Sequence, residues 1–244
     1  MSGLLCDDEC FARLTSQLEG VIFYGDPHGT WQPLFHAIDD TTHTVFILGD
    51  LAEAKQRPEH VEAARDALCQ LRARGIGVHF ILGNHDTETE AIHALIFEEF
   101  QENLIEEEVL SIGQPQCRIA GLGGVIRGKV WSGDDTPTFF SPSDLLARTP
   151  RQERCRGGLP RKQQSSIFPS TVQTLAQKRA DILLTHEAPS SHEHGFGFID
   201  DLAAQMGACL IIHGHHHFSY QDRLANGILV RGLGLAEVWK LGPA

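Results

Sequence analysis

The stretch VHFILGNHD, from Val78 to Asp86, decides the fold class, because a short apolar run stops at a glycine that polar residues follow. Such a run is typical of a buried strand. Four further apolar runs also end in residues that bind metal ions: VIFYGDPHG (21–29), TVFILGD (44–50), DILLTHE (181–187) and CLIIHGHHH (209–217). Ligands on an open α/β sheet gather at the carboxyl ends of its strands. The side chains that we expect at one such edge are Asp26, His28, Asp50, Asn84, His85, His186, His215 and His217.

Helical patterns alternate with the first three of these runs. Residues 58–74 place a proline at the first helical position and Gly75 at the C-terminal cap. Thr87 and Glu90 have the spacing of a capping box, which predicts the start of another helix. The alternation predicts a parallel, layered α/β arrangement in this half. The other elements expected here are helices at 7–18 and 31–38 and strands at 21–24, 44–48 and 78–82.

The second half of the chain has a different pattern. Residues 107–125 hold two short strands around Gly113-Gln114-Pro115, and Asn226-Gly227 is a strong signal for a second hairpin. Residues 127–169, here called the basic insert, lack clear periodicity, and so long a connection is typical of a functional or mobile segment. With no internal repeat and no linker, we expect one domain over residues 1–244. The remaining expected elements are helices at 170–179 and 199–206 and strands at 181–185 and 209–213.

Charge is unevenly distributed along the chain. The net charge is −12, yet residues 127–179 carry ten Lys or Arg against four Asp or Glu, so this segment is +6 and the rest is −18. An acidic body disfavours nonspecific binding of nucleic acid, whereas a local basic segment suits a small anionic substrate. We therefore expect a small phosphorylated or nucleotide-like partner and no nucleic acid.

Composition also bears on the compartment. No apolar stretch approaches the ~20 residues of a membrane span, and the first residues lack the features of a secretory signal. The six cysteines are scattered, so we expect reduced thiols in a cytoplasmic protein that has no membrane partner. Cys6 and Cys10 have a spacing that suits metal only with further soft ligands, and two thiols on a helix are favoured instead.

The residue types at the strand ends suit a pair of metal ions. Two divalent ions about 3.5–4 Å apart need several ligands each and one anionic bridge. Asp26 with His28, and His215 with His217, are each two residues apart and project together. Asp50 follows a glycine, where a carboxylate can approach both ions, and Asn84 offers an amide oxygen. Imidazole suits Zn, Fe, Ni or Mn.

In these motifs the chain resembles the calcineurin-like metallophosphoesterase family. The family signature is D-x-H, G-D, G-N-H-[DE], a lone His and G-H-x-H. All five blocks occur here in that order: Asp26-Pro27-His28, Gly49-Asp50, Gly83-Asn84-His85-Asp86, His186 and Gly214-His215-His216-His217. The resemblance implies a four-layer α/β/β/α sandwich, with two β-sheets flanked by helices.

The resemblance also implies roles. A metal-bridging hydroxide would attack a phosphomonoester or phosphodiester held at two divalent ions, with Mn²⁺ favoured over Fe, Zn, Ni or Mg. His85 would be the general acid, and Asp86 would fix its tautomer. The expected ligands are Asp26, His28 and His217 for the first ion, Asn84, His186 and His215 for the second, and Asp50 as the bridge.

One position departs from related enzymes. Phosphoprotein phosphatases of this superfamily extend the Gly-Asp block to an Arg-Gly, whereas this chain continues as Leu51-Ala52-Glu53-Ala54-Lys55. Lys55 or an arginine of the basic insert is a candidate substitute for the missing phosphate clamp. The insert also mixes arginines with aromatic residues, so a lid over the substrate and a solvated basic loop both stay open.

Two other functions remain as alternatives. A nuclease or nucleic-acid phosphodiesterase would use the same ligands but would need a basic groove beyond the insert. A non-catalytic metal-binding scaffold for protein interaction would keep the fold without turnover, and the filled position of His85 speaks against it. The pattern does not decide between monoesters and diesters, nor does it give the oligomeric state.

Overall fold

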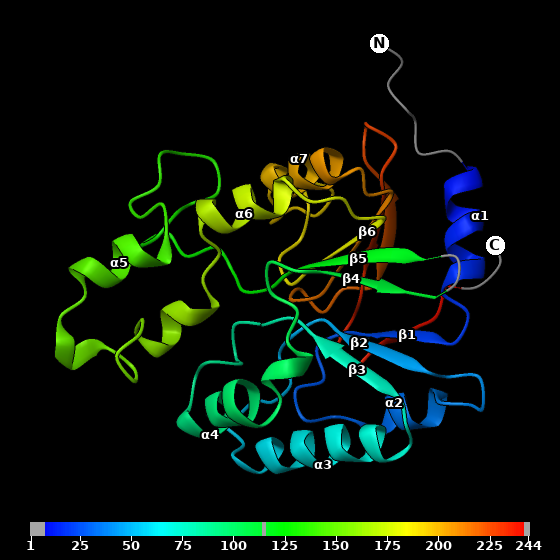
Figure 1. The fold of residues 1–244 in the computed structure, drawn as a ribbon, viewed down its shortest axis with the longest axis horizontal. Helices are drawn as coiled ribbons and strands as arrows, with labels where there is room; N and C mark the ends of the chain where they lie inside the picture. Colours follow the sequence, from blue (N-terminus) through cyan, green and yellow to red (C-terminus); the bar gives the residue numbers. More distant parts are fainter. Residues whose placement is uncertain (1–7, 114–115, 242–244) are drawn as a thin grey trace.

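Two β-sheets pack against each other between outer helices (Figure 1). The computed structural model describes residues 8–113 and 116–241. The first sheet has the strand order β10-β1-β2-β3, and the second has the order β4-β5-β6-β7-β9-β8. This arrangement confirms the predicted four-layer α/β/β/α sandwich.

The first sheet contains the three parallel strands predicted from the first three apolar runs. Its fourth strand comes from near the C-terminus and pairs antiparallel with the first. Because helices and the second sheet cover its two faces, the parallel strands are apolar on both sides. The strands are β1 (Val21–Tyr24), β2 (Thr44–Ile47), β3 (Gly77–Phe80) and β10 (Val238–Trp239).

The second sheet has a parallel centre and antiparallel edges. Both edge strands belong to hairpins, which confirms the pairing predicted around residues 113–115, of which 114 and 115 lie outside the described residues, and around Asn226-Gly227. The strands are β4 (Val109–Ile112), β5 (Cys117–Leu122), β6 (Ile182–Thr185), β7 (Leu210–His213), β8 (Tyr220–Arg223) and β9 (Leu229–Gly232).

Helices cover the outer face of each sheet (Figure 1). Helices α2, α3 and α4 lie on the first sheet, and α6 and α7 lie on the second. Helix α7 ends at Gly207, which has the left-handed backbone of a helix C-terminus. The helices are α1 (Asp8–Gln17), α2 (Gln32–Ala37), α3 (Glu59–Ala73), α4 (Glu90–Ala94) with a π-helical turn (Leu95–Glu99), α5 (Pro142–Arg148), α6 (Pro169–Ala176) and α7 (Gly197–Met206), with 3₁₀ turns at Gln101–Asn103, Arg151–Glu153 and Arg161–Ser165.

The space between the sheets is the central core. Alternate residues of β1 and β2 point into it, and the rings of Phe23 and Phe46 stack there with their centroids 5.5 Å apart. The intervening residues, among them Ile22 and Val45, pack under the helices instead. This double burial holds the carboxyl ends of the parallel strands in fixed positions.

The predicted capping box after β3 is wrong. The N-cap of α4 is Thr89, whose side chain accepts a hydrogen bond from the backbone N–H of Ile92. Thr87 is buried instead, and its Oγ1 lies 2.9 Å from Ser165 Oγ. The turn that follows the strand therefore extends two residues further than the spacing rule predicted.

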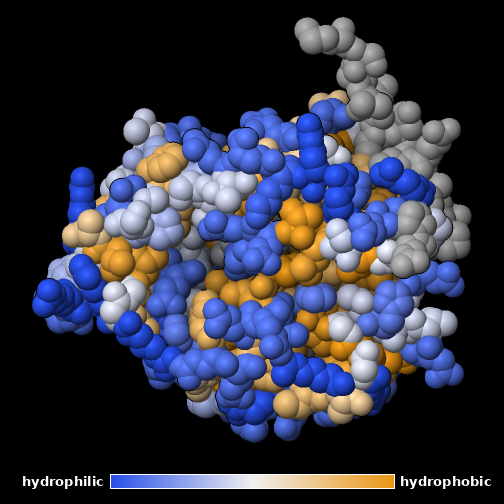
Figure 2. Space-filling view, viewed as in Figure 1, coloured by the Kyte–Doolittle hydropathy of each residue, from blue (hydrophilic) through white to orange (hydrophobic). Residues whose placement is uncertain are grey.

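The basic insert is more regular than its sequence suggests. Ser141 and Asp144 form a capping box that starts α5, and a small separate core contains Val130, Phe139, Leu145 and Phe168. In Figure 2, hydrophilic side chains project from the left end of the molecule, where α5 lies in Figure 1. The insert is thus a peripheral lobe with few apolar contacts of its own.

The cysteine prediction is wrong at one position. Cys209 is disulfide-bonded, whereas Cys69, Cys117 and Cys155 are free thiols. Cys6 and the side chain of Cys10 lie outside the described residues. No helix in the described ranges has the length and apolar character needed to cross a bilayer.

Candidate active site

Strand ends from both sheets meet at one edge of the sandwich, whereas the apolar runs had led us to expect these side chains at one edge of a single sheet. Asp26 and Asp50 follow β1 and β2, and His186 follows β6. The eight predicted side chains are held there by contacts given below, and the seven expected ligands among them are here called the metal edge. They are Asp26, His28, Asp50, Asn84, His186, His215 and His217.

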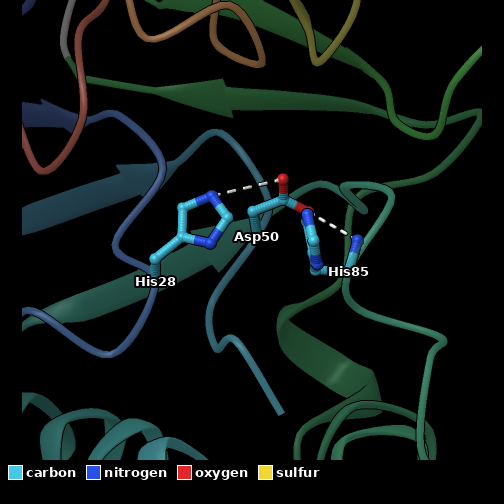
Figure 3. Close-up of side chains that lie close together, drawn as sticks. All are labelled: His28, Asp50 and His85. Carbon is cyan, nitrogen blue, oxygen red and sulfur yellow. Dashed lines mark hydrogen bonds and ion pairs between the residues drawn. The ribbon is translucent and has the colours of Figure 1, made fainter. Parts of the chain in front are cut away.

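The carboxylate of Asp50 is at the centre of this edge. Its Oδ2 lies 3.5 Å from His28 Nε2 and 3.3 Å from His186 Nε2, and its Oδ1 accepts a hydrogen bond of 2.7 Å from the backbone N–H of His85. Figure 3 shows His28 and His85 on either side of this carboxylate. A single side chain thus contacts residues from three different strands.

One group of ligand atoms combines residues that follow β1 with His217, which follows β7. His28 Nε2 is 3.1 Å from His217 Nε2, and His217 Nε2 is 3.9 Å from Asp26 Oδ2. Two imidazole nitrogens bound to one tetrahedral ion about 2.0–2.1 Å away are about 3.3 Å apart, so this spacing fits a shared cation. The other ring nitrogen of His28 is 2.9 Å from Glu53 Oε2, which orients the ring.

A second group surrounds His186. Its Nε2 lies 3.4 Å from Asn84 Oδ1, and its ring centroid is 4.9 Å from that of His215. Its Nδ1 is 2.6 Å from the carbonyl oxygen of Leu48, to which it donates. That hydrogen bond fixes the tautomer and leaves Nε2 directed at Asn84 and Asp50, as in a metal-binding histidine.

Burial of charge shows that the edge suits cations. Asp26, Asp50 and Asp86 are each at most 1% exposed, and Asp26 Oδ1 has no hydrogen-bond partner within residues 8–113 and 116–241. Burial raises the pKa of Asp26 to about 8, although His186 opposes the shift. Burial disfavours protonation of His186, but Asp50 and Asp26 raise its pKa to about 10. A cation is therefore the partner that suits the buried Asp26 carboxylate and its neighbour Asp50.

The backbone is strained at this edge. Five of the seven residues have positive φ angles although none is glycine. Such conformations cost about 1–3 kcal/mol each and cluster at functional sites. The residues are Asp26, His28, Asp50, His215 and His217.

Two motif glycines allow the carboxylates to approach. A Cβ at Gly83 would lie 2.1 Å from Asp50 Oδ1, and a Cβ at Gly214 would lie 2.6 Å from Asp26 Oδ1. Both distances are shorter than van der Waals contact, so a larger residue at either position would push a carboxylate away. The glycines of the G-N-H and G-H-x-H blocks are therefore required by packing against the metal edge.

Asp86 has a different role from the one expected. Its carboxylate accepts hydrogen bonds from the backbone N–H groups of Asp50, Leu51 and Gly83 at 2.7–2.8 Å. Those bonds join the turns after β2 and β3, so Asp86 orients backbone. Among the described contacts Asp86 has none with the ring of His85, whose Nδ1 lies next to Glu88 and Glu53 instead.

The ring of His85 is held by residues that the motifs did not indicate. Its Nδ1 is 3.1 Å from Glu88 Oε2 and 3.5 Å from Glu53 Oε1. Burial lowers the pKa of His85, but Asp50 and Glu88 outweigh that effect and raise it. Glu53 lies three residues after Asp50, and Glu88 lies three residues after His85. This spacing was the only indication in the two motifs that these glutamates lie at the site.

Further histidines lie next to the second-sheet ligands. The rings of His192 and His216 stack with centroids 4.0 Å apart, and both line a pocket with Phe218 and Tyr220. Because His216 lies between the metal-edge residues His215 and His217, this stacking places His192 beside the site.

Fold and site together define a metal-dependent phosphoric ester hydrolase, and comparison with known proteins agrees. Residues 20–219 match the calcineurin-like phosphoesterase family. An uncharacterized protein of Haemophilus influenzae is 38% identical over 207 residues, which cover 83% of this chain and 86% of that protein. The chain therefore belongs to the calcineurin-like phosphoesterase family.

Solved structures agree on the fold. A dimetal phosphatase from Danio rerio has a TM-score of 0.52 at 12% identity, with 89% of this chain and 88% of that chain covered. The phosphopantetheinyl hydrolase of Mycobacterium tuberculosis has a TM-score of 0.51 at 13% identity, with 90% and 91% covered. At such low identities the likeness concerns the fold alone.

Proposed function

We propose that the protein is a dinuclear metal-dependent phosphoesterase that hydrolyses a phosphomonoester or a phosphodiester. The observation that carries this proposal is the position of Asp50, whose Oδ2 lies within 3.5 Å of His28 Nε2 and 3.3 Å of His186 Nε2. A pair of cations needs one anionic oxygen between two sets of neutral donors as a shared ligand.

The ligand assignment follows from the two groups of donor atoms. Oxygen and imidazole donors of this kind suit Mn²⁺, which we propose as the native metal, and also accommodate Fe, Zn or Ni. Bound ions supply an activated water as nucleophile and neutralise charge on the phosphoryl oxygens. One ion would be held by Asp26, His28 and His217, the other by Asn84, His186 and His215, with Asp50 shared.

His85 protonates the leaving oxygen in this proposal. Its pKa is raised by Asp50 and Glu88 despite partial burial, so the ring carries a proton to higher pH than an ordinary histidine. The contact of Nδ1 with Glu88 leaves Nε2 as the nitrogen available for proton transfer. Asp86 keeps the backbone N–H groups of Asp50 and Gly83 in place, so it acts as a positioning residue.

The substrate in this proposal is a small phosphorylated or nucleotide-like molecule. The phosphopantetheinyl hydrolase of similar fold carries a small phosphorylated substrate in its name, which supports this class. The net charge of −12 disfavours long polyanions such as nucleic acid. We further propose that residues 1–244 form one domain that includes the basic insert.

A cytoplasmic location is also part of the proposal. The free thiols of Cys69, Cys117 and Cys155 support it, although the disulfide-bonded Cys209 does not. Immunodetection in fractionated cells tests this location, and recovery of the chain outside the cytoplasm would contradict it.

The test of the function compares two substrates and two variants. Mn²⁺-loaded protein is assayed with p-nitrophenyl phosphate and bis(p-nitrophenyl) phosphate, and bound metal is counted by mass spectrometry. We expect Asp50→Asn to lower kcat/KM by more than about 100-fold and to reduce metal content, because it removes the shared anion. The control is Asp222→Asn, an exposed carboxylate on β8. Full activity of Asp50→Asn with two ions bound would refute the proposal.

A further inference from the structure

A pocket beside the metal edge is lined by four cationic side chains. Asn84 also lines it, so the pocket opens onto the proposed metal ligands. Two of the cations come from the 3₁₀ turn near the end of the basic insert and one from its start, whereas the fourth follows the Gly-Asp block. They are Lys55, Arg127, Arg161 and Lys162.

Arg127 is built into this pocket. Its Nη2 donates to Ser165 Oγ at 3.1 Å, and Ser165 Oγ lies 2.9 Å from Thr87 Oγ1. Ser165 and Thr87 are each 1% exposed, and Thr87 directly follows the G-N-H-D block. The guanidinium is thereby anchored to the turn that carries Asn84, so its position relative to the metal edge is fixed.

The guanidinium has a donor left over. Arg127 Nε is buried and has no hydrogen-bond partner among the described residues, a cost for a charged group that an anion beside the guanidinium offsets. Burial also lowers the pKa of Arg127, and the nearby Glu187 and Glu88 oppose the shift. Arginine binds phosphate in a bidentate manner, so a phosphate is the anion that this geometry suits.

The remaining charges leave the pocket positive. Arg161 pairs with Glu90 at 2.8 Å, but among the described residues no carboxylate lies within ion-pair distance of Lys55 or Lys162, which are both exposed. The one acidic residue in the lining, Glu88, is in contact with His85. Lys55 and Lys162 are thus available to an anion bound at Arg127.

We propose that this pocket binds a second phosphate group carried by the substrate, so that the preferred substrates are small molecules with two phosphates. This inference rests on the proposed function, because the first phosphate is the one held at the metal edge. Asn84 belongs to both places, so the two places adjoin and two phosphates of one small molecule can reach both.

The test compares adenosine 5′-monophosphate with adenosine 3′,5′-bisphosphate as inhibitors of p-nitrophenyl phosphate hydrolysis. We expect the bisphosphate to bind roughly 10- to 100-fold more tightly, as two or more charged hydrogen bonds allow. Arg127→Met, Lys55→Met and Lys162→Met should each reduce that ratio. The two lysine variants remove exposed side chains that have no partner in the described structure, so they leave the fold intact. Lys129→Met, an exposed lysine of the same insert outside the pocket, should keep the ratio.

The outcomes separate this inference from the proposed function. The inference is overturned if the monophosphate and the bisphosphate inhibit the wild type equally, or if the ratio of their inhibition constants is unchanged in all three variants. Hydrolysis that depends on Asp50 would still support the proposed function in either case. Absence of any hydrolysis that depends on Asp50 counts against the function instead. In that event, calorimetry gives the dissociation constants of the monophosphate and the bisphosphate without turnover, and their ratio tests the inference independently of the function.

Discussion

The metal edge and the basic insert are built in opposite ways. At the metal edge the side chains follow buried parallel strands, and both sheets hold them in place. The basic insert has a small core around Phe139 and Leu145, and its cationic side chains are mostly exposed. Groups that bind metal need fixed geometry, whereas groups that select a substrate tolerate movement. The contrast suggests that reactivity resides in the sheets and selectivity in the insert.

The sharpest test of the metal edge removes His85. We expect His85→Ala to lower kcat on an alkyl phosphate by about 10²–10⁴-fold, because a poor leaving group needs a proton donor. The two metal ions should stay bound, since this ring is not in the proposed ligand set. Turnover and metal content are measured together, with His36→Ala, an exposed histidine of α2, as the control.

Leaving-group dependence distinguishes the roles of His85. With p-nitrophenyl phosphate the loss should be much smaller, because nitrophenolate leaves without protonation. Equal losses on both substrates would mean that His85 stabilises the phosphoryl group and does not protonate the leaving oxygen.

A pair of core substitutions tests how far the two regions differ in stability. Phe46→Ala, between the sheets, should lower the free energy of unfolding by about 3–5 kcal/mol, because it leaves a cavity in the main core. Phe139→Ala, in the small core of the insert, should lower it by less than about 1 kcal/mol, because the insert opens locally. Urea unfolding measures both variants.

Limited trypsin digestion completes that comparison. Phe139→Ala should speed cleavage within the insert, at the arginines between residues 148 and 161, and leave the rest of the chain intact. An equal loss of global stability in both variants would show that the insert unfolds with the sheets, and the contrast between the two regions would fail.

Another small effect is expected at the opposite end of the second sheet. Asp181, before β6, accepts hydrogen bonds from Arg118 Nε and Nη2 at 3.1 Å. Burial opposes its ionisation, but Arg118 holds its pKa below the ordinary value of 3.8. Asp181→Asn should therefore cost about 1 kcal/mol at pH 7, a modest value because Arg118 is partly exposed.

The pH dependence of that loss has a definite sign. Because the folded-state pKa is depressed, the ionised carboxylate contributes stability above pH 3.8, and the contribution disappears as pH falls through the folded-state pKa. Urea unfolding from pH 7 downward should show the wild type and Asp181→Asn converging in acid. A constant difference, or a change in metal content, would contradict this assignment.

The sequence predicted most of the sheets because their signals are local. Each ligand directly follows an apolar run, so a strand prediction places Asp26, Asp50 and His186 at strand ends, and the family resemblance implies the two sheets that bring those ends together. The hairpin at Asn226-Gly227 is local for the same reason, since two residues determine the turn.

What could not be predicted depends on contacts between distant segments. The role of Asp86 is determined by backbone N–H groups from another turn, and that of Thr87 by Ser165 in the insert. Helix α5 is short and held by a capping box, so it has too few turns for an apolar period to appear. The disulfide state of Cys209 likewise requires a partner that spacing alone does not indicate.

The five metal-edge residues with positive φ angles affect which substitutions selection would favour in this chain. Glycine or asparagine would adopt the backbone conformation of these five positions at a lower cost in free energy. Selection for thermal robustness alone would therefore erode the ligands first, since replacing them releases strain.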